Sequence, residues 1–281
     1  MNSLVALTRP AKVSWELIVV DNNSTDETRP TVAGFQAVLP LRYVFEPLQG
    51  LSAARNRAIR EFTGDVLLFT DDDVVVDQNW LRAFESASSS FPLAGYFGGR
   101  VIPFYPSGKP GWLQDEGLAL LSGLLVRYHL GESTRRLLPC EPTPFGASFG
   151  IRRHVIHATG EFRCDLGVIG GVPGRGEESE YLHRVRAAGY DGVYVGDAIA
   201  HHSTDPRRLT LGYLFRYGVQ TGVAESRTGS TAFGSITTAV AFAARGCVQL
   251  LRGRGDRFRQ CVINIGIQMA LRRTPNRVPR R

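Results

Sequence analysis

The stretch LLFTDDDVVVDQNWL, residues 67–81, places Asp71, Asp72 and Asp73 directly after a short apolar run. Runs of this length that are rich in Leu, Val and Phe are typical of buried strands. Three adjacent negative charges repel one another, and this repulsion lowers stability unless a positive charge lies nearby. The stretch therefore predicts a buried strand whose end faces a positively charged partner.

The sequence around this stretch alternates between strand and helix signals. Short apolar runs also end in a carboxylate at 15–21 and 41–46, and the Ala-rich segment 51–62 has a helical pattern. This alternation predicts that roughly the first 100 residues form a doubly wound α/β unit. Ligands of such sheets bind beyond the carboxyl ends of the strands, so we expect Asp21 and Asp71–Asp73 to line one crevice. Carboxylates in a crevice are natural ligands of a hard divalent cation.

The composition is that of an ordinary globular protein, with 281 residues, 43% hydrophobic and 21% charged. A formal charge of +7 suits anionic partners, or reflects only a preference for arginine in the coding sequence. The four cysteines include no C-x-x-C pair, which argues against a zinc or redox motif. The N-terminus does not read as a signal peptide, and no apolar run is long enough to predict a membrane-spanning helix.

Three interpretations of the triple aspartate compete. The acids cap a turn after the strand, or Asp71 is the covalent nucleophile of a haloacid-dehalogenase-type phosphatase. That phosphatase also needs a downstream lysine, and only Lys109 follows, within a Pro- and Gly-rich loop. In the third interpretation the acids hold a divalent cation that neutralises a leaving diphosphate. This third interpretation predicts further motifs, which are present.

Five segments occur in an order that resembles the inverting family-two glycosyltransferases of the GT-A fold. They are ELIVVDNNSTDET (16–28), GLSAARNRAI (50–59), GDVLLFTDDDVVVDQNWL (64–81), GEESEYLHRVRAAGY (176–190) and AIAHHSTDPRRLT (198–210). The resemblance covers roughly residues 3–225. It implies an α/β GT-A glycosyltransferase domain at 1–225, with a mixed, mainly parallel sheet flanked by helices. It leaves an Arg-rich helical extension at 226–281.

The resemblance also implies a nucleotide-sugar site. Its residues would be Asp21, Asn23, Ser52, Arg55, Asn56, Asp71 and Asp72, with Ala147 and Ser148 of the small-residue run 145–150 beneath the donor sugar. For Arg55 the alternative is an arginine on a solvated helix face.

The metal and the catalytic base follow from the same resemblance. Mn²⁺ or Mg²⁺ would be held by Asp71 and Asp73, with Asp73 the main ligand, and either His201 or His202 would complete the site, since imidazole is an acceptable ligand. Glu178, beside Glu177, matches the position of the base. The family's usual base is Asp, and Glu reaches one methylene further. The alternative is that these acids only favour a helix N-terminus.

The expected activity is metal-dependent transfer of a sugar, with inversion, from a nucleoside-diphosphate sugar to a hydroxyl. UDP is favoured, with GDP and dTDP open, and the acceptor would be a saccharide or a lipid-linked molecule of polysaccharide, cell-envelope or glycolipid synthesis. We expect a cytoplasmic enzyme, peripheral on the inner face of the cell membrane. The last 37 residues contain ten arginines and one acid, Asp256, which suits an amphipathic segment on anionic lipid or an ordinary helical pair. Nucleic acid is not an expected partner, because no aromatic platform accompanies the charge.

Members of the family begin with a strand upstream of the segment 16–21, and this sequence has none there. We therefore expect a truncated sheet in which Ile18 to Val20 lack a hydrogen-bonding neighbour. This leaves open a degenerate homologue that binds a nucleotide or a partner without catalysis.

Overall fold

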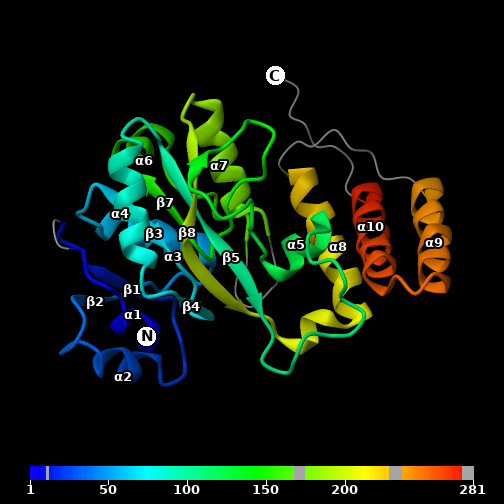
Figure 1. Ribbon diagram of the computed structural model, residues 1–281, viewed down its shortest axis with the longest axis horizontal. Helices are drawn as coiled ribbons and strands as arrows, with labels where there is room; N and C mark the ends of the chain where they lie inside the picture. The colour runs from blue at the N-terminus through cyan, green and yellow to red at the C-terminus, as the bar shows by residue number, and fades with distance from the viewer. Residues whose placement is uncertain (11–12, 168–174, 228–235, 274–281) are drawn as a thin grey trace. The chain divides into compact units, whose positions relative to one another are not determined.

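The computed structural model describes residues 1–10, 13–167, 175–227 and 236–273 (Figure 1). Its elements, in chain order, are α1 (Asn2–Val5), β1 (Leu17–Asp21), α2 (Thr28–Ala33), β2 (Leu41–Phe45), α3 (Leu51–Glu61), β3 (Val66–Phe69), β4 (Val74–Val76), α4 (Trp80–Ser90), β5 (Tyr96–Phe104), α5 (Ala119–Leu125), β6 (Arg135–Arg136), β7 (Phe149–Arg152), α6 (Arg153–Thr159), α7 (Glu177–Ala187), β8 (Gly192–Ser203), the 3₁₀ helix η1 (Pro206–Leu209), α8 (Leu211–Arg227), α9 (Ile236–Leu251) and α10 (Gly255–Arg273).

The chain divides into two compact units. The sheet unit comprises Met1–Ile102, Tyr128–Val172 and Glu177–His202, and the helical unit comprises Pro103–Arg127, Pro173–Gly176 and Ser203–Arg281. All the residues predicted to form the active site belong to the sheet unit. The predicted domain boundary at residue 225 stays a prediction.

The sheet unit contains a mixed α/β arrangement, as predicted. Strands β1 and β2 pair in parallel, with Leu17 opposite Leu41, and a larger sheet has the order β3-β7-β5-β8-β4, with β6 on β8. The expectation of a mainly parallel sheet is wrong for the larger sheet. There β7 runs antiparallel to both β3 and β5, and β8 runs antiparallel to β4 and β6.

Several strand edges remain open within the described residues, and two of them adjoin the predicted site. Strand β1 pairs only with β2, and β3 ends the order of the larger sheet, where it pairs with β7. The residues Leu17 to Val20 are only half-buried, although strands inside α/β sheets are normally covered on both sides. The arrangement agrees with the prediction that Ile18 to Val20 have a strand neighbour on one side only.

Two apolar clusters cover opposite faces of the larger sheet. Because side chains alternate along a strand, Tyr96 of β5 joins a cluster with α3, α6 and α7, and Phe97 joins a second cluster with α4. Both rings are almost completely buried. This packing holds the strand ends, and hence the acidic residues that follow them, in place.

In the helical unit, α10 lies between α8 and α9 (Figure 1). Glycines allow α8 and α10 to approach closely. A Cβ on Gly218 would lie 2.1 Å from the backbone oxygen of Ile263, and one on Gly266 would lie 2.4 Å from that of Phe215. Helices α9 and α10 occupy the segment predicted to be a helical extension. No helix among the described residues has the length and apolar character needed to cross a bilayer.

Candidate active site

The three aspartates lie in the link between β3 and β4. Strand β4 pairs with β8, and Val74 lies opposite His202. This register brings the Nε2 atom of His202 to 3.3 Å from the Oδ2 atom of Asp73. Asp72 is exposed, and about a third of the Asp71 side chain reaches solvent (31%). The site therefore joins the end of β3 to the end of β8.

The structure separates the two candidate histidines. His202 is 3% exposed, and its Nδ1 atom has no hydrogen-bond partner among the described residues. Adjacent residues of a strand point to opposite faces, so His201 cannot share the position of His202 beside Asp73. The structure therefore brings His202, and not His201, to the aspartates, and the role of either histidine as a metal ligand stays a prediction.

Arg55 lies at the centre of the site. It is 5% exposed, its Nη1 donates to Oε1 of Glu177 at 3.0 Å, and its Nη2 lies 3.8 Å from Oδ1 of Asp71. Its guanidinium carbon is 5.9 Å and 5.6 Å from the ring centroids of Phe149 and Phe162. The interpretation of Arg55 as a solvated helix residue is wrong, because the helix face that carries it is buried against these rings.

Glu177 and Glu178 open helix α7 and respond differently to their surroundings. Burial opposes ionisation of Glu177, but Arg55 outweighs it and holds the pKa of this carboxyl below its usual range. Burial, with the adjacent negative charge of Glu177, raises the pKa of Glu178 to about 8. Glu177 is thus ionised and paired with Arg55, whereas the pKa of Glu178 is shifted towards neutral pH. A general base works best when its pKa lies in this range.

Burial also raises the pKa of Asp71. Arg55 acts in the opposite direction, and the negative charge of Asp73 adds to the effect of burial. A cation placed between these carboxylates would relieve their repulsion. The repulsion between the aspartates that the sequence predicted is therefore present. Arg55 is a positively charged partner of Asp71.

Asp21 ends β1 in a buried position. It accepts hydrogen bonds from the hydroxyl of Tyr43 and, at 2.9 Å, from the backbone N–H of Ser24. Burial alone would raise the pKa of Asp21, but these hydrogen bonds hold it below its usual value. Asn22 donates to the carbonyl of Leu48 and accepts from the N–H of Gly50, which ties the loop before α3 to the end of β1.

Ser52 and Asn56 on α3 are buried and face the segment 162–166. Ser52 donates to the carbonyl of Leu166, and Asn56 exchanges two hydrogen bonds with the backbone of Phe162. In the structure these side chains position α3, and their contact with a nucleotide stays a prediction. Asn23 is exposed with a left-handed backbone (φ 62°), as is common for asparagine in turns.

Ala147 and Ser148 are completely buried. The hydroxyl of Ser148 accepts a hydrogen bond from the indole N–H of Trp80 at 2.9 Å. Ser148 thus belongs to the core contact between β7 and α4, and the prediction that this run lies under a donor sugar remains untested.

The predicted metal site can be tested against the donor atoms present. Among the described residues no three His, Cys, Asp or Glu side chains are arranged to enclose a metal ion. Asp73 and His202 nevertheless lie together, and His202 has a buried, unpartnered nitrogen. Mg²⁺ and similar ions bind nucleotides through one or two protein groups and complete their coordination with phosphate oxygens and water. The residues fit a metal site of this open kind.

Some residues of the site were not predicted from the sequence. Gly146 is one of them. It belongs to the site because a Cβ there would lie 2.0 Å from the Nη2 atom of Arg55. Tyr43, Asn22 and the two phenylalanine rings beside Arg55 are others. The small residues at 145–150 were a usable signal for close packing, but nothing local to the sequence identifies Arg55 as the group that needs the space.

Comparison with known proteins decides the family. The model of the family described as "Glycosyl transferase family 2" matches residues 2–159, more than half of the chain. The chain belongs to glycosyl transferase family 2. This glycosyltransferase carries its buried Arg55 and its aspartate cluster within the matched region, whereas Glu177, Glu178 and His202 lie after it.

Curated relatives of this glycosyltransferase include two that match over most of the chain. The succinoglycan biosynthesis protein ExoM of Rhizobium meliloti is 26% identical over 231 residues, which are 81% of this chain and 69% of that protein. Glycosyltransferase AglE of Haloferax volcanii is 27% identical over 220 residues, which are 78% of this chain and 66% of that protein. The chain thus spans about two thirds of the length of these relatives.

Solved structures share the fold of this glycosyltransferase. The mannosyltransferase PcManGT from Pyrobaculum calidifontis, in complex with GDP-Man and Mn²⁺, has a TM-score of 0.57 at 17% identity and covers 91% of this chain and 77% of its own. TarS of S. aureus, in complex with UDP-GlcNAc, has a TM-score of 0.56 at 13% identity and covers 93% of this chain and 85% of its own. These similarities confirm a GT-A fold.

Proposed function

We propose that this glycosyltransferase is metal-dependent and inverting, and that it transfers a sugar from a nucleoside diphosphate to an acceptor hydroxyl. The observation that carries the proposal is the carboxylate pair at the start of α7, in which Glu178 has a pKa of about 8 beside an ionised Glu177. The pair is joined through Arg55 to the aspartates after β3. A base and a diphosphate-binding cluster in one site are what a single displacement needs.

In the proposed reaction, Glu178 takes the proton of the acceptor hydroxyl. The oxygen then bonds to the anomeric carbon on the face opposite the diphosphate, as the bond to the diphosphate breaks. Arg55 holds Glu177 ionised, and the charge of Glu177 makes Glu178 a stronger base. Asp21 and the loop that Asn22 holds lie where we propose that the nucleoside binds.

A divalent cation, Mn²⁺ or Mg²⁺, would be held by Asp73 with His202, and Asp71 lies close to the same cluster. When bound, such a cation neutralises the negative charge of the departing diphosphate. PcManGT and GalNAc-T7, two structures of the same fold, were solved with Mn²⁺, which supports the choice of metal.

A UDP-sugar is the favoured donor, and GDP and dTDP are the alternatives. TarS was solved with UDP-GlcNAc and PcManGT with GDP-Man, so the fold accommodates more than one base. The relation to a succinoglycan biosynthesis protein supports an acceptor in polysaccharide or cell-envelope synthesis. A lipid-linked acceptor would place the enzyme in the cytoplasm at the inner face of the membrane.

The alternatives from the sequence fare differently. Family membership overturns the haloacid-dehalogenase phosphatase, and Lys109 is paired with Glu116 at 2.9 Å. A degenerate, non-catalytic homologue gains some support from the open edge of β1. Turnover of a nucleotide-sugar donor separates this alternative from the enzyme.

The first experiment is calorimetric titration of UDP, GDP and dTDP into the full chain with Mn²⁺, and again with EDTA. We expect one nucleotide to bind only with the metal, and Asp73→Ala to abolish that binding. Metal-independent binding, or unchanged binding by Asp73→Ala, contradicts the proposed metal site.

The neighbouring histidines provide a matched pair of variants for the same titration. His202→Asn should weaken metal-supported binding by about tenfold or more, by analogy with the loss of other metal-site partners. His201→Asn should have a much smaller effect, because its side chain lies on the other face of β8. If His201→Asn has the larger effect, the assignment of His202 is wrong.

A further inference from the structure

Helix α9 packs on α10 with one face only. Gly246 is buried on that face, and a Cβ there would lie 3.3 Å from both Phe258 and Cys261 of α10. Thr238, Phe242 and Gln249 lie near the same side of α9 as Gly246, and all three are half-buried. Residues three and four apart share a helix face, so the remaining positions of α9 face away from α10.

The side of α9 that faces away from α10 is apolar. Its central residues, here called the α9 stripe, are Val240, Ala244, Cys247, Val248 and Leu251, and all five are exposed. Val240 is 60% exposed and Leu251 is 88% exposed. Helices whose outer face meets water normally carry charged or polar residues there. A contiguous exposed apolar patch of this kind indicates a surface that binds a partner or a membrane.

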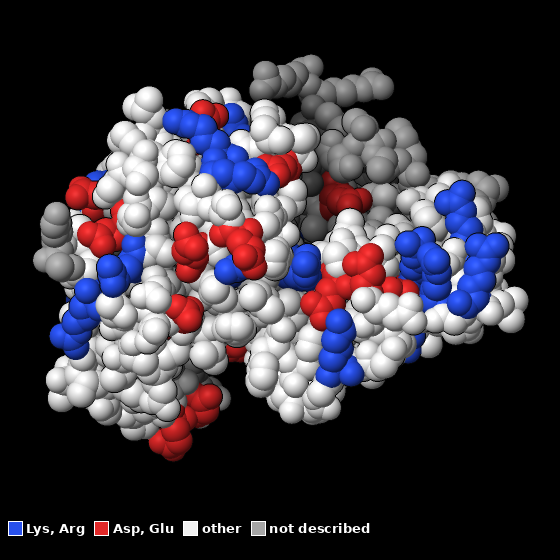
Figure 2. Space-filling view, in the orientation of Figure 1, with Lys and Arg blue, Asp and Glu red and all other residues white. Residues whose placement is uncertain are grey.

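Arginines border the α9 stripe. Arg245 and Arg252 are seven residues apart and lie along one border, and Arg254 and Arg257 follow at the turn into α10. All four are exposed, and none belongs to a salt bridge recorded for the described residues. Figure 2 shows basic side chains gathered over α9 and α10, with uncharged surface between them.

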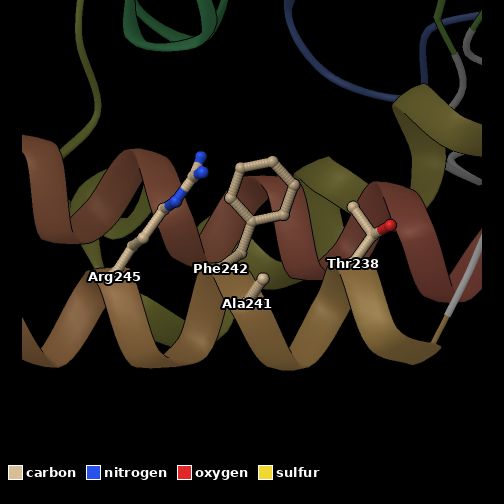
Figure 3. A pocket seen from close by; sticks show the side chains of 4 residues that line it. All are labelled: Thr238, Ala241, Phe242 and Arg245. Atoms are coloured by element: carbon tan, nitrogen blue, oxygen red, sulfur yellow. The ribbon is translucent and has the colours of Figure 1, made fainter.

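A shallow pocket along this border adds an aromatic ring to the basic side chains. It is lined by Thr238, Ala241, Phe242 and Arg245. Figure 3 shows the ring of Phe242 and the guanidinium of Arg245 projecting from the same side of α9. An aromatic ring and a basic group beside an apolar face suit the boundary between headgroups and acyl chains.

We propose that α9 lies in the plane of an anionic membrane surface, with the α9 stripe at the acyl boundary and the arginines on lipid phosphates. The combination of an apolar face and a basic border favours this partner, because each arginine near an anionic leaflet adds electrostatic attraction. A second copy of the chain is a poorer partner for the same face. Two such faces would bring their arginines together and repel each other. The inference goes beyond the proposed transferase activity and does not depend on it.

The test is sedimentation of the full chain with phosphatidylcholine vesicles, with and without about a third of phosphatidylglycerol. We expect binding to the anionic vesicles only, weakened as salt is raised because of screening. Leu251→Asp should weaken binding by tenfold or more, and Arg245→Gln with Arg252→Gln by roughly fivefold for each arginine. Leu251 is almost fully exposed, so its substitution leaves the core intact.

Leu93→Asp is the matched control, because Leu93 is 82% exposed and lies in the sheet unit between α4 and β5. It should bind vesicles like the unmodified chain. Equal loss in Leu93→Asp and Leu251→Asp, binding to neutral vesicles alone, or no binding would overturn the proposal. So would a concentration-dependent dimer that Leu251→Asp dissociates, since it would show that a second copy covers the α9 stripe. Nucleotide titration without vesicles is a separate readout, so failure of the transferase proposal would be seen independently.

Discussion

Arg55 is a buried positive charge whose partners come from distant parts of the chain. It contacts Glu177, lies within 3.8 Å of Asp71, and is enclosed by Phe149 and Phe162. Removing one partner of a buried ion pair leaves the other charge uncompensated, which costs about 3–5 kcal/mol. We therefore expect Arg55→Met to lower the free energy of unfolding by that amount, measured by urea denaturation at pH 7.

The loss in Arg55→Met should be smaller in acid. Arg55 lowers the pKa of Glu177 in the folded protein, so the stability it contributes is present above the unfolded pKa and is lost as the pH falls through the folded value. Arg57→Met is the matched control, because Arg57 is on the same helix but pairs with Glu61 near the surface. It should cost at most about 1 kcal/mol. Similar losses in the two variants would contradict the central place of Arg55.

Glu178 gives the proposed reaction a characteristic dependence on pH. A general base acts only when it is deprotonated, and the pKa of Glu178 is about 8. We expect kcat/KM to rise with pH, to reach about half of its maximum near pH 8, and to level off only at higher pH. The measurement is the initial rate of transfer at saturating metal between pH 6 and pH 9.5. A rate that is flat across this range, or that falls as the pH rises, would exclude Glu178 as the base.

Replacement of Glu178 by Gln removes the proton acceptor and keeps the size of the side chain. We expect kcat to fall by about 10² to 10⁴, with nucleotide binding retained. Glu180→Gln is the control from the same helical turn, because Glu180 is engaged by Arg184 at 2.8 Å. It should leave kcat close to that of the unmodified chain.

At the scale of elements, α8 and α10 pack closely because glycines carry no side chain at their contact. A Cβ on Gly218 would lie 2.1 Å from the backbone oxygen of Ile263, so the helices must separate to accept it. We expect Gly218→Ala to destabilise the protein by about 1–3 kcal/mol, measured by chemical denaturation.

Gly212, on the same helix, is the matched control for that substitution. A Cβ there would meet only the end of the Arg216 side chain, at 3.8 Å. Because alanine favours a helix over glycine, Gly212→Ala should be neutral or stabilise by up to about 1 kcal/mol. Equal destabilisation by both variants would show that the cost arises from the helix itself and not from the contact of α8 with α10.

Local sequence patterns predicted some helices and strands well and others incompletely. The strand before Asp71 and the helix beginning at Glu177 were both predicted, because apolar runs and acidic helix starts are local signals. The strand directions of the larger sheet were not predicted. They depend on β7, which inserts between β3 and β5 from far along the chain.

At the scale of the whole molecule, the described residues of the sheet unit form two separate sheets, β1-β2 and the larger one. Strand β1 is bonded along one edge and is half-buried, whereas β5 is central and almost fully buried from Tyr96 to Gly99. Amides opened by local unfolding exchange faster. We expect peptides covering Ile18 to Val20 to exchange hydrogen at least about tenfold faster than those covering β5.

Mass spectrometry of deuterium uptake by the full chain measures this difference directly. Protection of β1 equal to that of β5 would contradict the open edge and would indicate a further strand partner for Ile18 to Val20. Added nucleotide and Mn²⁺ should slow exchange around Asp21 if the nucleoside binds there, which also tests the proposed site.

The sequence by itself determined the class of fold, the family motifs and the residue types of the site. Apolar runs, helix starts and acidic clusters can each be recognised within a short segment of the chain. The sequence predicted Asp73 and Glu178 as functional residues, and it left His201 and His202 open. Only the tertiary structure distinguishes the two: it places His202 beside Asp73, because the register of β4 on β8 decides which histidine faces that carboxylate. It also enclosed Arg55 among residues that are up to 122 positions away in sequence. Burial and long-range charge set the pKa of Glu178, and both exist only once the chain has folded.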